Sequence, residues 1–143
     1  RGFSNPSLNS LRRIANSLNV PMLYFLAERP NPAPLVRLSE RAQIDLEESN
    51  VRYEMLTPDL SHSFVSVIGK LKPGNENIVR PLATETEEMI HVLQGVLKVG
   101  LGEEDYTLNS GDSITFYGKD LTRMLCGSDQ EVTWISVITP PVF

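Results

Sequence analysis

Residues 87–95 read Glu-Glu-Met-Ile-His-Val-Leu-Gln-Gly, and residues 108–116 read Leu-Asn-Ser-Gly-Asp-Ser-Ile-Thr-Phe. The first run ends at a glycine, and in the second a glycine–aspartate pair comes directly before a short apolar run. Alternating apolar and polar residues over such lengths are typical of β-strands, and glycine, aspartate and asparagine favour the turns between strands. The two runs therefore predict two strands joined through a region of tight turns.

The rest of the chain after residue 34 continues this pattern of short apolar runs separated by turn residues. Lys72-Pro73-Gly74 and Gly102-Glu103-Glu104-Asp105 are turn sequences, and the second is expected to be a solvated hairpin tip. Many short strands at such spacing favour a mainly β sandwich or barrel. We expect strands at residues 35–38, 52–56, 63–71, 78–82, 89–93, 96–101, 106–108, 113–117, 122–126 and 132–138.

The first 28 residues have a different pattern, with apolar residues at helical spacing. We expect one helix over residues 7–18, preceded by the start signals Asn5-Pro6-Ser7, and a second, short helix over residues 21–28. Residues 29–34 read Arg-Pro-Asn-Pro-Ala-Pro, which cannot continue a helix and favours an extended linker. The chain thus divides into residues 1–28, a proline-rich linker at 29–34, and residues 35–143.

Composition narrows the class of protein. The chain has 143 residues and a net charge of −5; residues 1–29 contribute +3, and the remainder contributes −8. The acidic part is a poor nucleic-acid ligand by itself. No apolar run approaches the ~20 residues that span a bilayer, and the single cysteine, Cys126, allows no internal disulfide. We expect a cytoplasmic protein without a membrane partner. Because the first residue is Arg1, we also expect the chain to be a fragment or a processed product.

Residues 35–143 resemble the cupin family, whose double-stranded β-helix is a jelly-roll barrel. Several short motifs carry the resemblance: residues 53–56, Lys72-Pro73-Gly74, Glu87-Glu88, residues 92–95, Gly111-Asp112 and residues 139–143. Many cupins hold a metal on histidines and one glutamate. In that motif Glu88 takes the position of the glutamate. The histidine positions fall on Leu82 and Thr84 or their neighbours, and on Thr122.

The resemblance therefore implies a cupin without its metal ligands. One glutamate and a threonine hydroxyl are too few donors for a divalent metal. His91 is out of phase with Glu88, so we expect it to face away from the barrel interior, and His62 lies in a polar turn. No arrangement typical of a catalytic nucleophile is present, and Cys126 reads as an inert core thiol. We predict no catalytic residue, no metal and no cofactor.

The interior of such a barrel is then expected to bind a small organic molecule. An apolar pocket with a few polar groups is typical of such sites, whereas the alternative is a fully packed barrel in which Glu88 pairs with Arg80 or turns to solvent. Arg123 is out of phase and expected at the surface. Strand alternation predicts these ligand-binding residues: Arg80, Leu82, Thr84, Glu88, Ile90, Ile114, Phe116, Thr122, Met124 and Cys126.

Residues 5–21 are similar to the last part of the lambda-repressor-like helix-turn-helix domain of the XRE family, with Asn5-Pro6-Ser7-Leu8, Ile14-Ala15 and Val20-Pro21 at matching positions. Residues 1–28 would then be two helices left from that domain, and the DNA-reading helices would lie upstream. The combined resemblance implies a ligand-responsive transcriptional regulator that forms a homodimer through its cupin domain and binds DNA through its N-terminal domain. Two alternatives remain: a mononuclear metal enzyme of the phosphonate-epoxidase type, and a dimerisation module without a ligand.

Overall fold

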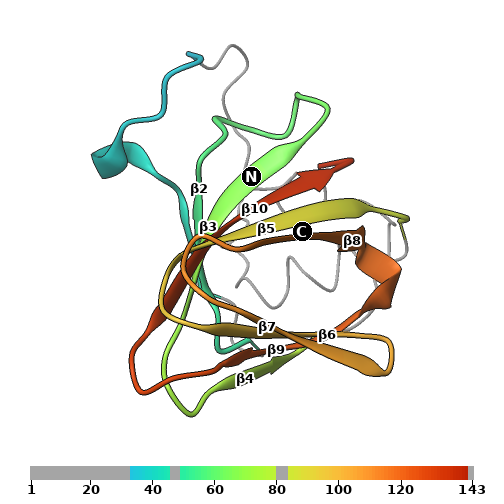
Figure 1. Ribbon diagram of the computed structural model, residues 1–143. Coiled ribbons are helices and arrows are strands. Elements are labelled where there is room, and N and C mark those ends of the chain that lie inside the picture. Colours follow the sequence, from blue (N-terminus) through green and yellow to red (C-terminus); the bar gives the residue numbers. More distant parts are fainter. Residues whose placement is uncertain (1–32, 46–48, 80–83, 142–143) are drawn as a thin grey trace, which may run out of the picture.

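The computed structural model describes residues 33–45, 49–79 and 84–141, with the side chains of Asp45 and Ile78 left out. The described residues form two antiparallel sheets (Figure 1). The larger sheet has six strands in the order β1-β2-β3-β10-β5-β8. Their bounds are β1 Gln43–Asp45, β2 Arg52–Met55, β3 Val65–Leu71, β10 Val132–Thr139, β5 Glu87–Gln94 and β8 Ser113–Tyr117.

The smaller sheet has four strands in the order β4-β9-β6-β7. They are β4 Glu76–Ile78, β9 Leu121–Cys126, β6 Leu97–Leu101 and β7 Glu104–Leu108, and two single-turn 3₁₀ helices accompany the strands, η2 at Leu38–Glu40 and η3 at Gly118–Asp120. Figure 1 shows the two sheets facing each other. Gly95 and Gly111 both have positive φ angles, 84° and 93°, which explains why glycine stands at these turns.

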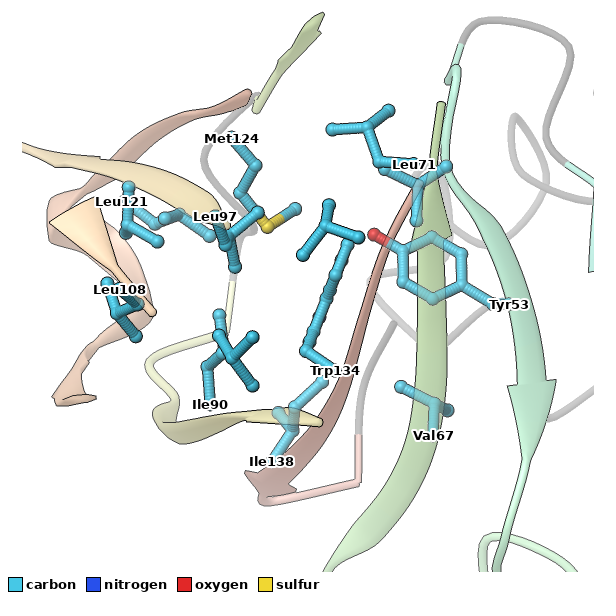
Figure 2. Packing of buried hydrophobic residues seen from close by; sticks show 14 of the residues in the cluster. Tyr53, Val67, Leu71, Ile90, Leu97, Leu108, Leu121, Met124, Trp134 and Ile138 are labelled. Carbon is cyan, nitrogen blue, oxygen red and sulfur yellow. The ribbon is translucent and has the colours of Figure 1, made fainter. Parts of the chain in front are cut away.

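The core lies between the sheets and follows from the alternation along each strand. In β10, Val132, Trp134 and Ser136 are buried, whereas the residues between them are only partly buried. Trp134 is fully buried and occupies the centre of the core; Leu97 and Met124 lie to one side of it, and Tyr53 and Leu71 to the other (Figure 2). The mainly β barrel expected from the sequence is therefore confirmed.

The N-terminal part of the described chain differs from the prediction. Residues 35–38 were expected to form a strand, but residues 35–37 have no regular secondary structure and Leu38 begins η2, none of whose residues is buried. The first strand in the described part of the chain is instead β1, Gln43–Asp45, which pairs with β2. Leu35 and Leu38 are exposed and contribute nothing to the barrel core, so hydrophobicity alone gave the wrong strand. The predicted helices at 7–18 and 21–28 lie outside the described residues.

A bulge in β9 changes which side chains face the core. Opposite β6, Gly100 pairs with Arg123 and Leu101 pairs with Leu121, so Thr122 is the extra residue. A β-bulge breaks the two-residue alternation. The prediction that Thr122 faces inward is therefore wrong: it is exposed, beside Arg123 and Asp105, and Leu121 is buried in its place.

Candidate functional site

The candidate site is a group of inward-facing residues on β5, β8 and β10, which we call the Glu88 cluster: Glu88, Ile90, Phe116, Trp134 and Ser136. Strand pairing brings the members together, since Glu88 pairs with Phe116 on one side and with Ile138 on the other. Ile90 and Trp134 are fully buried, and Phe116 is 6% exposed. Glu88 is thus the single carboxylate of a cluster that is otherwise apolar apart from one hydroxyl and one indole N–H.

A short chain of hydrogen bonds holds the Glu88 carboxyl. The Ser136 side chain hydrogen-bonds to Glu88, and Trp134 Nε1 donates to Ser136 Oγ at 3.2 Å. The backbone of Ser136 is fixed as well, because its carbonyl oxygen accepts a hydrogen bond from Ser66 Oγ at 3.1 Å. Ser136 pairs with Ile90 in the sheet, one step along the inner face from Glu88. Ser136 was not among the site residues predicted from the sequence, although a serine between two inward-facing apolar residues was the available signal.

The position of the Trp134 ring depends on a glycine in the neighbouring strand. Trp134 pairs with Gly69 of β3, and a Cβ atom at Gly69 would overlap the indole ring. The missing side chain of Gly69 therefore gives the indole its place in the core. From that place its N–H reaches Ser136.

Burial raises the pKa of Glu88 to about 7, and the hydrogen bond from Ser136 acts in the opposite direction. A carboxylate that loses water without gaining a charged partner is expected to behave in this way. Glu88 nevertheless keeps part of its surface exposed, as do Thr84 and Ile114. Glu88 therefore lies on the inner face of the sheet, largely surrounded by protein atoms, with part of the residue exposed.

The predicted site residues divide into three groups. Glu88, Ile90, Phe116, Met124 and Cys126 lie on inner faces as expected, and Ile114 packs against the core. Thr84 is partly buried just before β5, and Thr122 lies outside the barrel. Arg80 and Leu82 are outside the described residues. The Cys126 thiol donates to the carbonyl oxygen of Gln130 at 3.0 Å.

Several residues that were expected at the surface are there. His91 lies on the outer face of the six-stranded sheet, where its Nδ1 is 2.7 Å from Ser113 Oγ. Arg123 is half-exposed and forms ion pairs with Asp105, at 3.2 Å, and Glu76, at 3.7 Å. Residues 103–105 are exposed, as predicted for a hairpin tip, and His62 is exposed. The described part of the chain contains no helix with the length and apolar character that a membrane crossing requires.

The residues around Glu88 do not fit a metal ion. Among the described residues, no group of three histidine, cysteine, aspartate or glutamate side chains is placed to hold one. The neighbours of Glu88 on the inner face are Ile90, Phe116, Ser136 and Ile138, which supply one hydroxyl oxygen. Residues 80–83 read Arg-Pro-Leu-Ala and include none of these ligand types. A divalent metal needs several converging donors, so no metal chemistry is assigned to this cluster.

Solved structures of similar fold include regulators and enzymes. A transcriptional regulator of the HTH_3 family from Vibrio cholerae is 23% identical, with a TM-score of 0.70 over 95% of this chain and 73% of that one. The cupin domain of an XRE family transcriptional regulator from Enterobacter cloacae is also 23% identical, with a TM-score of 0.58 over 64% of this chain and 97% of that one. Ectoine synthase from P. lautus is 15% identical, with a TM-score of 0.58 over 70% of each chain.

At these identities the structural comparisons show a shared fold, and a comparison with curated protein sequences finds no match. The family comparison goes further. The Cupin_2 family, described as a cupin domain, matches residues 67–138, from the middle of β3 to the end of β10. This span covers half of the chain and includes the whole Glu88 cluster, so the protein belongs to the Cupin_2 family of cupin domains.

Proposed function

We propose that the chain is the sensor part of a ligand-responsive transcriptional regulator, and that a small organic molecule binds at the Glu88 cluster. The observation that carries the proposal is the state of Glu88, a largely buried carboxylate inside an apolar barrel with no metal-binding partners among the described residues. A buried charge is costly unless a partner offsets it. In this proposal the ligand is the partner of the Glu88 carboxylate, and the site has no catalytic role.

The regulatory role draws on two further observations. Two of the similar structures are a regulator and the cupin domain of a regulator. Residues 5–21 resemble the end of a helix-turn-helix domain, which would put the DNA-reading helices upstream of Arg1. In this proposal the cupin domain forms a homodimer in the cytoplasm, and the ligand shifts the equilibrium between two dimer geometries. Because two DNA-binding heads must match the spacing of operator half-sites, such a shift would change DNA affinity.

Operator binding tests this role. Two proteins are compared on DNA fragments selected from the source genome: the 143-residue chain, and the same chain extended with the residues encoded upstream. The extended protein should bind specific fragments, and its affinity should fall steeply with salt, as for proteins that neutralise phosphates. The 143-residue chain should bind weakly and without specificity, because residues 30–143 carry a net charge of −8.

Two results would overturn the regulatory role. Specific binding by the 143-residue chain would show that the DNA-reading surface lies elsewhere. Failure of the extended protein to select any fragment would remove the helix-turn-helix assignment of residues 1–28. Neither result depends on Glu88, so the experiment stands apart from any test of the ligand site.

A further inference from the structure

The hydrogen-bond chain behind Glu88 has a fixed direction. An indole N–H can only donate, so Ser136 Oγ must accept from Trp134 Nε1. The Ser136 hydroxyl proton is then left to donate to Glu88. Glu88 therefore accepts a hydrogen bond from Ser136 of β10, and this hydrogen bond favours the ionised form of Glu88. A carboxylate has about four acceptor positions, and Ser136 fills one of them.

The surroundings of Glu88 supply no positive charge within the described part of the chain. The inner faces of β5, β8 and β10 carry no cation, and the facing strands β6 and β9 present Leu97, Val99, Leu121 and Met124. Besides Glu88, the titratable groups on the inner faces of the described strands are the Tyr53 phenol and the Cys126 thiol. Neither is positively charged. Three cations at the surface have carboxylate partners of their own: Arg41 and Lys70 form ion pairs with Glu54, and Arg123 forms ion pairs with Glu76 and Asp105.

From this geometry we propose that the barrel binds a small organic ammonium, whose cationic head hydrogen-bonds to Glu88 and whose apolar body packs against the partly exposed Ile114 and against Phe116. The proposal rests on the proposed sensing role of the barrel and names the chemical class of the ligand. An ammonium supplies hydrogen-bond donors to the carboxylate, and it also supplies the positive charge that the described surroundings of Glu88 lack. A neutral hydroxyl supplies a donor without the charge, and an anion would be repelled.

Three probes with similar apolar bodies test the class: butylammonium, 1-butanol and butanoate. Trp134 is the single tryptophan, so its indole N–H gives one resonance in a ¹H–¹⁵N spectrum and reports directly on the bond to Ser136. Butylammonium should shift this resonance in a saturable way. 1-Butanol should bind at least about tenfold more weakly, and butanoate should leave the resonance in place.

Two variants separate Glu88 from general electrostatic attraction to an acidic protein. Glu88→Gln should reduce the affinity for butylammonium to that for 1-butanol. The matched control is Glu87→Gln, which removes an exposed carboxylate from the neighbouring residue of the same strand and should change nothing. The ¹H–¹⁵N spectrum of each variant shows whether it is folded. If Glu88→Gln does not fold, the pH dependence of the wild type replaces it: affinity for butylammonium should fall about tenfold per pH unit below about 7, where Glu88 takes up a proton.

The outcomes distinguish this inference from the sensing role. If 1-butanol or butanoate shifts the indole resonance as strongly as butylammonium, the ammonium class is wrong and ligand binding in the barrel stands. If Glu87→Gln weakens binding as much as Glu88→Gln, the cation binds at the surface and the inference fails. If none of the probes shifts the resonance, the inference fails as well, and operator binding decides the regulatory role separately.

Discussion

The proposed ligand binding of this barrel depends mainly on the side chain of Glu88. It occupies the glutamate position of the cupin metal motif, but its neighbours on the inner face are apolar side chains and the Ser136 hydroxyl. Its position on the inner face could be predicted from alternation along residues 87–95. Its partner could not, because Ser136 lies 48 residues further along the chain and meets Glu88 only through the pairing of β5 with β10.

Glu88 should make the stability of the fold depend on pH. Its pKa is raised from 4.5 to about 7, so the folded state prefers the protonated form. The associated stabilisation is complete below about pH 4.5 and is lost as pH rises toward 7, by at most about 3 kcal/mol. Glu88→Gln cannot ionise. Relative to wild type, its free energy of unfolding should therefore increase between about pH 5 and pH 8, as measured by urea denaturation.

The same measurement distinguishes a Glu88 that is available to a ligand from a Glu88 that forms an ion pair within the chain. If a cation of the chain such as Arg80 pairs with Glu88, Glu88→Gln should be less stable than wild type at pH 8, because the variant leaves that cation without its partner. That result would remove the unpaired carboxylate from which the ligand proposal starts. The variant Glu87→Gln, at an exposed position, should follow wild type throughout.

Strand β10 is the element that organises the site. It pairs with β3 on one side and with β5 on the other, and it carries both Trp134 and Ser136 on its inner face. Regular alternation made this strand and β5 predictable from sequence. The same rule failed for Thr122, because one extra residue in β9 reversed the alternation, and it failed at residues 35–38, where apolar residues have no strand to pair with.

Substitution of Gly69 tests whether β3 sets the position of the indole. A Cβ atom in Gly69→Ala would overlap the Trp134 ring, so the variant should lose about 1–3 kcal/mol of stability, as overpacked cores do. The indole N–H resonance should also move, because the ring must shift away from Ser136. Gly74→Ala is the control: it changes a glycine on a turn with nothing within 4 Å of the new Cβ, so it should leave the indole resonance unchanged. An unchanged resonance in Gly69→Ala would contradict this role of Gly69.

For the whole molecule, the sequence was sufficient to predict a mainly β cupin barrel, and the family match over residues 67–138 confirms it. The function needs more than the fold, since similar folds occur in regulators and in an enzyme such as ectoine synthase. The chemistry open to this chain depends on the side chains inside the barrel rather than on the fold. The cupin frame is present, but the positions that the motif gives to metal-binding histidines fall on Leu82, Thr84 or their neighbours, and on Thr122.

The metal content of the purified protein tests this account most directly. The protein is purified without chelators, dialysed against metal-free buffer and measured by elemental analysis. Because Glu88 has no converging imidazole, thiolate or second carboxylate among the described residues, the account predicts far less than one equivalent of iron, manganese, nickel or zinc per chain. One tightly held equivalent of any of these metals, lost in Glu88→Gln, would contradict the account and favour a metal-dependent enzyme.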